Sequence, residues 1–295
     1  MRRLSTRIVL FGLLVFFVYL AFSMFVRYKV NEQFKVVLNP SVRYLVIGNS
    51  HPECALNDSL APLMSNWGRS GEALYYSAIK AKKIIEENPQ LKLICIELSV
   101  NQLDAHMQDW VYDAEHMERA FKSYGFLISV REQQELFWTN PIEFCKASVM
   151  SDKKCVSTLL VKNDLTPKGL EWGGFQKHKI SKVDSLLKLN TPCQGTLNLQ
   201  PLAENLKAVE DLVQFAKIRG VEVILIRCPV HPQIGRCWEQ SFDSIRKEKF
   251  GTLPFFDFQD WKGEQEEYLD LEHLNTKGAN KFTPYFDSVI VNGMQ

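Results

Sequence analysis

Two short segments near opposite ends of the chain carry the residues best suited to nucleophilic chemistry. Ser50 follows an apolar run that ends at Ile47, and Asp270 stands three residues before His273. A serine hydroxyl is a poor nucleophile until a neighbouring imidazole takes its proton. A carboxylate is then needed to fix the tautomer of the imidazole and to offset its positive charge. The sequence therefore predicts that Ser50 is a nucleophile, His273 its general base and Asp270 the orienting acid.

Strand-like and helix-like segments alternate along the part of the chain that must position these residues. Short apolar runs predict buried strands, and apolar residues at helical spacing predict helices. The predicted strands are 42–47, 91–98, 221–226 and 253–258, and the predicted helices are 73–87, 202–219, 239–249 and 276–286. This order is typical of α/β proteins with a parallel sheet between two layers of helices, a three-layer α/β/α fold of the flavodoxin-like kind.

The predicted fold brings the two reactive segments together. Ligands on open parallel sheets bind beyond the carboxyl ends of the strands. Ser50 lies just past the end of the first predicted strand, and Asp270 and His273 lie past the end of the last one. All three residues are therefore expected at one edge of the sheet.

Two further histidines fall near this edge. His51 directly follows Ser50, and we interpret it as a supporting residue or a substrate contact, since the base is assigned to His273. His231 follows a predicted strand, and the sequence leaves open whether it lines a cleft or lies in an ordinary loop. Cys228 and His231 have the spacing of a ligand pair, but no second pair accompanies them, so no metal site is expected. The chain has no phosphate-binding or dinucleotide-binding glycine motif, so no cofactor is expected.

The N-terminus carries an uncharged apolar run at residues 8–26, which is long enough to cross a membrane. Arg2, Arg3 and Arg7 precede the run and favour a cytoplasmic N-terminus, with the rest of the chain outside the cytoplasm. A cleaved signal peptide is the alternative, because Ala21-Phe22-Ser23 resembles a cleavage site. We expect a single-pass anchor with its transmembrane helix at 1–27, a spacer at 28–40 and a folded domain at 41–295.

The stretch 104–198 departs from the alternating pattern, and we interpret it as an irregular or partly helical insertion over the same edge of the sheet. It is rich in aromatic residues, namely Trp110, Tyr112, Tyr124, Phe126, Phe137, Trp138, Trp172 and Phe175. These side chains either line a sugar-binding or acyl-binding cleft or form the insertion's own core. The sequence leaves both interpretations open.

Charge and cysteine content limit the possible function classes. With Lys+Arg 35 against Asp+Glu 34, the net charge is +1, so the chain lacks the basic excess of a nucleic-acid-binding protein. Cys95 lies inside an apolar run and is expected in the core. Cys145 with Cys155, and Cys228 with Cys237, are spaced to close short loops in an oxidising compartment, although the sequence does not fix the pairing.

The chain resembles the SGNH, or GDSL, hydrolases at four places in the family's order. Gly48-Asn49-Ser50 resembles the Gly-Asp-Ser block, and Asp270 with His273 resembles the C-terminal Asp-x-x-His block. Between them, residues 66–71 resemble the glycine block that follows the second strand, and residues 99–102 resemble the Gly-x-Asn-Asp block. Three family positions differ in this chain, where Asn49, Ser99 and Gln102 replace Asp, Gly and Asp.

The resemblance implies how a developing oxyanion is bound. In the family, the donors are the amide of the nucleophile, an amide from the glycine block and the asparagine side chain of the third block. In this chain these are Ser50, either Gly68 or Gly71, and Asn101. Loss of one such donor typically costs about 10²–10³ in rate.

The resemblance and the predicted anchor together imply a function at a bacterial cell membrane. Anchored SGNH-like proteins outside the cytoplasm add or remove acyl groups on cell-surface polymers. The chain is therefore expected to be a periplasmic or cell-surface serine esterase or O-acyltransferase, acting on an acylated glycan or a small acyl ester through acyl-Ser50. A transferase would need a membrane acyl-donor protein as its partner. The alternative is a catalytically silent, membrane-tethered glycan-binding or scaffold protein on the same fold.

Overall fold

The structure is a computed structural model that describes residues 2–160, 166–189 and 197–293. The chain divides into two compact units, one comprising Met1–Lys35 and Met117–Glu171 and the other Val36–His116 and Trp172–Gln295. The α-helices are α1 (Arg2–Gln33), α2 (Ser50–Ala55), α3 (Leu74–Glu87), α4 (Val100–Leu103), α5 (Asp109–Tyr112), α6 (Ala114–Tyr124), α7 (Val130–Thr139), α8 (Pro141–Leu160), α9 (Val183–Leu189), α10 (Ala203–Ile218), α11 (Glu239–Phe250) and α12 (Thr276–Gly293). The strands are β1 (Tyr44–Ile47), β2 (Met64–Asn66), β3 (Leu93–Glu97), β4 (Glu222–Arg227) and β5 (Phe255–Asp257).

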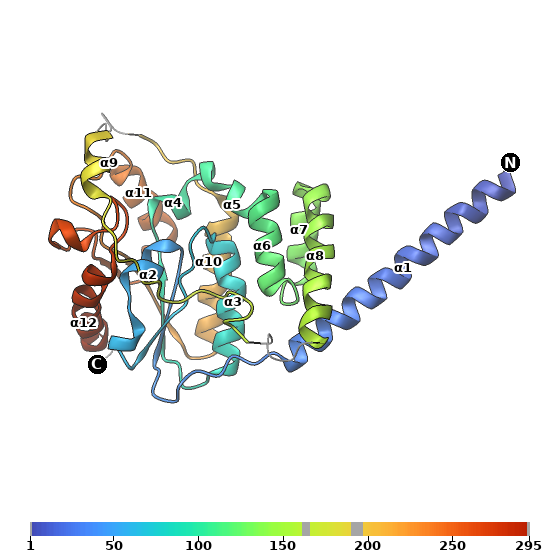
Figure 1. Ribbon diagram of the computed structural model, residues 1–295, viewed down its shortest axis with the longest axis horizontal. Helices are drawn as coiled ribbons and strands as arrows, with labels where there is room; N and C mark the ends of the chain where they lie inside the picture. Colours follow the sequence, from blue (N-terminus) through green and yellow to red (C-terminus); the bar gives the residue numbers. More distant parts are fainter. Residues whose placement is uncertain (1, 161–165, 190–196, 294–295) are drawn as a thin grey trace. The chain divides into compact units, whose positions relative to one another are not determined.

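The second unit is built around a parallel five-stranded sheet with the order β2-β1-β3-β4-β5 (Figure 1). All four pairs of neighbouring strands run parallel. This is the flavodoxin-like order, in which ligands bind where the direction of winding reverses, between β1 and β3. The predicted α/β class with a parallel sheet is therefore confirmed.

Both faces of the sheet are covered, as the apolar runs of the sequence predict. Tyr44 and Val46 of β1 belong to a buried cluster with Phe282 and Phe286 of α12. The alternate residues of β1 are also fully buried, and helices α3 and α10 pack against each other on the opposite side of the sheet from α12 (Figure 1). The sheet thus forms the middle of three layers.

The first unit consists of α1 and most of the segment from α6 to α8. Its aromatic side chains contact each other, with ring centroids 5.4 Å apart for Phe34 and Phe126 and 5.6 Å apart for Phe121 and Phe144. Phe137 also packs on Phe144. Phe126 and Phe137, two of the aromatic residues noted in the sequence, thus pack within this unit, whereas Trp138 is 80% exposed and Trp110, Tyr112, Trp172 and Phe175 belong to the second unit.

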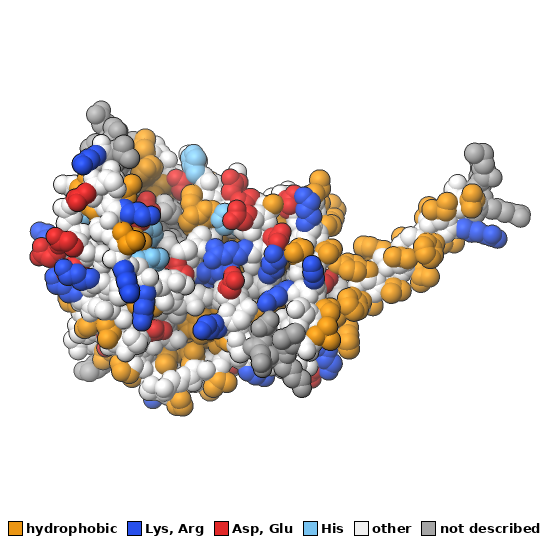
Figure 2. Space-filling view, in the orientation of Figure 1, with side chains coloured by type: hydrophobic (Ala, Val, Ile, Leu, Met, Phe, Trp, Pro, Cys, Tyr) orange, Lys and Arg blue, Asp and Glu red, His pale blue; other side chains and the backbone are white. Residues whose placement is uncertain are grey.

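Helix α1 changes its surroundings part-way along its length. Its apolar side chains from Leu4 to Phe22 are largely exposed (Figure 2), whereas Val26 and Val30 are buried. The stretch Leu4–Gln33 is apolar enough to cross a membrane, as a signal sequence or as an anchor. The helix continues to Gln33 and so includes the first residues of the segment 28–40 that we predicted as a spacer.

A buried ion pair joins α1 to α8 within the first unit. Arg27 Nε donates to Asp152 Oδ1 at 2.6 Å, and the two side chains are 10% and 5% exposed. Tyr19 donates its hydroxyl to Oδ2 of the same carboxylate at 2.8 Å. The C-terminal part of α1 is therefore an integral part of the unit's packing.

The structure also corrects the interpretation of the cysteines. The stretch 104–198 is divided between the two units, because its described residues up to His116 and from Trp172 belong to the second unit. Cys145 and Cys155 are free thiols, since they lie ten residues apart on the single helix α8, about 15 Å along its axis. Cys228 is a free buried thiol and Cys237 is disulfide-bonded, so they do not pair with each other; residues 161–165 and 190–196, including Cys193, lie outside the described residues.

Candidate active site

The nucleophile is positioned by a tight turn between β1 and α2. Gly48 has φ +151°, and a Cβ on it would lie 2.6 Å from Cβ of Glu97 in the neighbouring strand β3. Asn49 caps α2, because its side chain accepts a hydrogen bond from the backbone N–H of His51 at 3.0 Å. Asparagine at the family's aspartate position thus keeps the acceptor that the helix cap needs. Ser50 is the first residue of α2, where a backbone N–H has no acceptor within the helix.

The three residues predicted as nucleophile, base and acid form one hydrogen-bonded chain. His273 Nε2 lies 2.7 Å from Ser50 Oγ. His273 Nδ1 lies 2.9 Å and 3.0 Å from the two carboxylate oxygens of Asp270. This arrangement is consistent with the tautomer a general base requires, with the proton on Nδ1 and the lone pair of Nε2 directed at the serine.

Asp270 is held as a carboxylate. Burial acts to raise its pKa, but the hydrogen bond and charge of His273, with backbone amides of Glu272 and His273, outweigh burial and lower the pKa below its usual value. Those two amides donate to Asp270 Oδ1 at 2.8 Å and 2.9 Å. These backbone amides therefore position the Asp270 carboxylate independently of the His273 ring.

The two glycines proposed as oxyanion donors differ in the structure. The amide of Gly68 already donates to Asn66 Oδ1 at 2.9 Å. Gly71 has φ +66° and follows Ser70, whose amide donates to Glu53 Oε2 at 2.9 Å. Glu53 is one helical turn after Ser50 on α2, so this bond holds the Gly71 loop beside the nucleophile's turn.

The third block lies at the end of β3. Asn101 on α4 lines a cavity together with His51 and Ser99. Gln102 is fully buried and holds the start of α3, since its side chain accepts from Leu74 N and donates to Glu72 O, each at 3.1 Å. Glutamine at the family's aspartate position therefore has a structural role.

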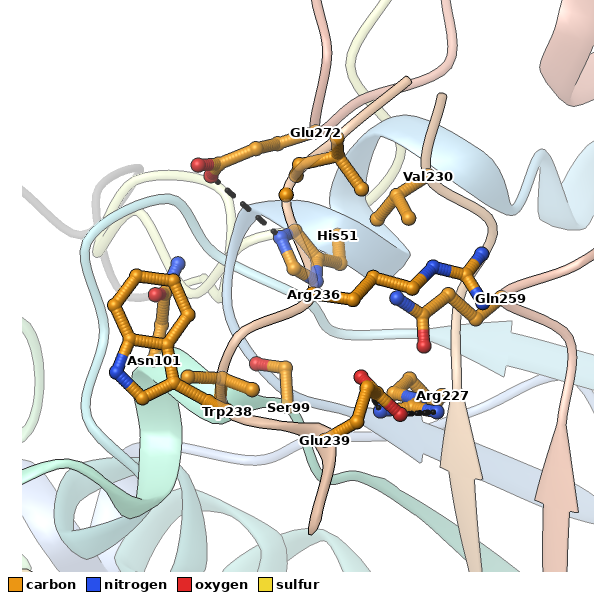
Figure 3. A pocket seen from close by; sticks show the side chains of 13 residues that line it. His51, Ser99, Asn101, Arg227, Val230, Arg236, Trp238, Glu239, Gln259 and Glu272 are labelled. Carbon is orange, nitrogen blue, oxygen red and sulfur yellow. Dashed lines mark hydrogen bonds and ion pairs between the residues drawn. The ribbon is translucent and has the colours of Figure 1, made fainter. Parts of the chain in front are cut away.

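A cavity of about 240 Å³ in the second unit is lined by His51 and Glu272, the chain neighbours of Ser50 and His273 (Figure 3). It is lined by His51, Ser99, Val100, Asn101, Arg227, Val230, Ile234, Gly235, Arg236, Trp238, Glu239, Gln259 and Glu272. The Arg227 guanidinium is already engaged by the carboxylates of Glu239 and Asp257, so its charge is neutralised within the wall. None of the aromatic residues noted in 104–198 is among these lining residues; the aromatic wall is Trp238.

His51 lies between two carboxylates. Its Nδ1 is 3.1 Å from Glu97 Oε1, and its Nε2 is 4.0 Å from Glu272 Oε2. Burial acts to lower the pKa of His51, but the charges of Glu97 and Glu272 outweigh it and raise the pKa to about 10. His51 is therefore an imidazolium at neutral pH, and an imidazolium cannot accept a proton as a general base does.

His231 packs against the loop that carries Asp270 and His273. Its backbone N–H donates to Leu271 O at 2.9 Å, and its ring packs edge to face on Tyr268 with centroids 4.9 Å apart. Burial lowers its pKa, so the ring is neutral at neutral pH. His231 is not among the residues that line the cavity described above, and its role as a cleft residue stays a prediction.

Donor atoms of His51, Glu272 and His273 lie within 4.8 Å of one another, as in some metal sites. A metal would require a lone pair on each imidazole. His51 carries protons on both ring nitrogens at neutral pH, and His273 Nε2 is engaged with Ser50. These residues are therefore better suited to proton and hydrogen-bond chemistry.

Two acidic residues of the site were missed by the sequence interpretation in their present roles. Glu97 is fully buried at the end of β3, and a charged residue inside an apolar run is a signal, because burying an unpaired charge is costly. Glu272 stands between Asp270 and His273 in the sequence, with no sign there that its carboxylate faces His51. Arg236 and Trp238 lie just before α11 and line the cavity. Nothing in the neighbouring sequence predicts this position.

Comparisons with known proteins give distant similarity. A family model without a descriptive name matches residues 199–295. No curated protein matches the chain in sequence. Among solved structures, a candidate acylhydrolase from Bacteroides fragilis is 12% identical, covers 90% of this chain and 95% of its own, and has a TM-score of 0.42. A GDSL-like lipase from Bacteroides thetaiotaomicron is 12% identical, covers 92% of this chain and 99% of its own, and has a TM-score of 0.39.

Proposed function

We propose that the protein is a membrane-anchored serine esterase or O-acyltransferase that works through an acyl-Ser50 intermediate. The observation that carries this proposal is the continuous hydrogen-bonded chain from Ser50 Oγ through His273 to Asp270. The order of the SGNH-like blocks in the sequence also supports the proposal. Each block follows a strand, so that all four lie at the same edge of the sheet.

The proposed reaction uses each residue in one role. His273 Nε2 takes the Ser50 proton as Oγ attacks the acyl carbonyl, and Asp270 stabilises the imidazolium that forms. The Ser50 amide, the Gly71 amide and the Asn101 side chain receive the oxyanion, with Gly71 chosen because the Gly68 amide is already bonded. The alkoxide leaving group takes the proton from His273, and acyl-Ser50 remains.

The second half of the reaction decides between esterase and transferase. Water or a sugar hydroxyl loses its proton to His273 and attacks the acyl carbon; the bond to Ser50 Oγ then breaks, Oγ regains the proton from His273, and the acid or a new ester is released. A transferase would receive its acyl group from a membrane acyl-donor protein. Among the described residues only α1 is long and apolar enough to span a membrane, and one helix provides no route for an acyl group across the bilayer.

The proposed location is the extracytoplasmic side of a bacterial cell membrane, in the periplasm or at the cell surface. Two features support it. The arginines before the apolar run favour a cytoplasmic N-terminus. The disulfide at Cys237 fits an oxidising compartment. An acylated envelope glycan is the substrate that the family resemblance suggests for a protein in this place.

A silent glycan-binding or scaffold protein receives less support. The altered block residues Asn49 and Gln102 have structural roles, as a helix cap and as a clamp on α3. Neither change disturbs the contact of Ser50 with His273. A binding protein has no chemical need for an intact triad.

Hydrolysis of p-nitrophenyl acetate by the full-length chain in detergent tests the proposal. The wild type should release p-nitrophenol, whereas a folded Ser50→Ala variant should be reduced to the background rate. The matched control is Ser288→Ala, which alters an exposed serine of α12 whose hydroxyl donates to Tyr285 O and which should keep the wild-type rate. Equal turnover by wild type and Ser50→Ala would refute the serine mechanism.

A further inference from the structure

We infer that His51 and Glu272 form a binding site for a hydroxyl group of the substrate, so that the site takes esters of polyols such as sugars. The inference rests on the proposed function, since it assigns the substrate class of the same site. The two side chains face each other across one end of the cavity (Figure 3).

The first observation is a buried donor without a hydrogen-bond partner among the described residues. His51 is 6% exposed, and its Nε2 has no hydrogen-bond partner among the described residues. A buried polar group left unpaired costs about 1–3 kcal/mol. Since His51 lines the cavity, an acceptor atom of a bound molecule is in a position to remove that cost.

The second observation is that the ring of His51 cannot easily turn away. Its Nδ1 is held by Glu97 Oε1 at 3.1 Å, and Glu97 is itself fully buried at the end of β3. Gly48 also packs closely on Glu97, since a Cβ at position 48 would lie 2.6 Å from Cβ of Glu97. The Glu97 side chain therefore has little freedom to move. Nε2 is thus held in its direction by the fold, as an imidazole is by a carboxylate at its other nitrogen.

The third observation is the size of the gap. His51 Nε2 and Glu272 Oε2 are 4.0 Å apart, which is longer than a hydrogen bond. One oxygen atom that makes two hydrogen bonds of about 2.8 Å bridges such a gap. The geometry therefore fits one bound oxygen between the two side chains.

The chemistry of the two partners selects a hydroxyl. His51 is charged, with its pKa raised to about 10, so Nε2 donates a hydrogen bond. Glu272 is ionised, because its interaction with the nearby His51 cation lowers its pKa despite partial burial, and it is therefore an acceptor for a hydrogen bond. A hydroxyl both accepts and donates. A carboxylate would be repelled by Glu272, and an ammonium group has no lone pair for His51.

The site lies next to the reacting atoms. His51 follows Ser50 in the chain, and Glu272 precedes His273. The ring centroids of His51 and His273 are 5.3 Å apart. The hydroxyl bound by His51 and Glu272 would therefore sit on a carbon close to the carbon that carries the ester. A polyol has such a second hydroxyl, and a simple alcohol does not.

A pair of esters tests the inference. One is methyl glucoside carrying a single acetyl group, and the other is the same ester with its remaining hydroxyls methylated. The full-length wild type in detergent with EDTA should prefer the free-hydroxyl ester by at least about tenfold in kcat/KM, because a site built for a hydroxyl rejects the analogue that lacks it. Glu272→Ala and His51→Gln should bring this ratio close to one.

Controls separate this inference from the proposed function. Glu272 is 48% exposed in its side chain, so its variant should fold even if His51→Gln does not. Glu266→Ala removes an exposed acid of the same loop that does not line the cavity, and it should keep the wild-type ratio. An unchanged ratio in Glu272→Ala would overturn the hydroxyl site while leaving the esterase intact.

Binding provides a readout that does not depend on turnover. In the Ser50→Ala background, calorimetry should show at least about tenfold tighter binding of the free-hydroxyl ester than of the methylated one. Adding Glu272→Ala should remove that preference. If wild type hydrolyses neither ester yet this preference is found, the esterase reaction fails and the hydroxyl site stands; equal binding of the two esters refutes the site.

Discussion

The imidazole rings of His51 and His273 lie edge to face with their centroids 5.3 Å apart, and each directs its Nδ1 to a carboxylate. The two pairs differ in burial. Glu97 is fully buried, whereas the side chain of Asp270 is 27% exposed. The two histidines differ at their other nitrogen, because His51 Nε2 faces the carboxylate of Glu272 at 4.0 Å whereas His273 Nε2 lies 2.7 Å from Ser50 Oγ.

Asp270→Asn tests whether the orienting acid acts on the histidine tautomer. Asparagine keeps the size of the side chain but removes the charge and presents a donor to His273 Nδ1. We expect kcat for p-nitrophenyl acetate to fall by about 10³–10⁴-fold, with thermal stability little changed. The measurement is kcat beside that of Glu266→Ala. A loss below about tenfold would argue against the triad.

The charge of His51 should make stability depend on pH. Its pKa is raised from the ordinary 6.5 to about 10. The stabilisation is complete below about pH 6.5, where both folded and unfolded states hold the proton. It declines as pH rises towards 10, because only the folded state keeps the proton there, and it is lost above that pH.

The difference in unfolding free energy between wild type and His51→Gln isolates this effect from other titrating groups. As pH rises from about 6 to about 10, the unfolding free energy of the wild type should fall relative to that of His51→Gln. Urea unfolding across that range provides the values. A difference that stays constant with pH would show that His51 is not charged in the folded protein.

Gly48→Ala should be destabilising for a reason specific to the site. The new Cβ would meet Cβ of Glu97 at 2.6 Å, and φ is +151°. Overpacking of this kind costs about 1–3 kcal/mol, in addition to the backbone strain. Gly220→Ala is the matched control, because Gly220 also has a positive φ, +69°, but has open space around its Cβ position. Similar melting temperatures for the two variants would show that the β1–β3 approach is not tight.

The ion pair of α1 with α8 makes a separate prediction for the first unit. Arg27→Ala leaves Asp152 buried without its cation, which typically costs about 3–5 kcal/mol. Arg131→Ala breaks an exposed pair with Glu135 on α7 and should have little effect. The measurement is the rate of cleavage within α8 during limited proteolysis of each full-length variant in detergent. Equal resistance would indicate that α1 does not contribute to the unit's packing.

The sequence predicted the sheet and the triad because their signals are local. Continuous apolar runs marked β1, β3, β4 and β5, while the three-residue strand β2 was implied only by the family blocks. Ser50 and His273 were brought together by the rule that parallel strands end at one edge. That rule needs only the order of elements along the chain.

The remaining features depend on contacts between distant residues. Nothing near His51 in the sequence indicates that Glu97 and Glu272 surround it, since the three belong to different loops and strands. The bond from Gly68 to Asn66, which favours Gly71 as the oxyanion donor, is a matter of loop geometry. Likewise, the burial of Val26 and Arg27 in α1 follows from packing on α8, and the apolar run alone gave no sign of it.

Mass spectrometry of the covalent intermediate is the most direct test of the central claim. Full-length protein is incubated with p-nitrophenyl acetate or with a serine-reactive fluorophosphonate, quenched in acid and digested. The account predicts one adduct on the peptide that contains Ser50, absent in Ser50→Ala and much slower to form in His273→Ala. Turnover of esters by folded protein without any adduct on Ser50, or with the adduct on another residue, would contradict it.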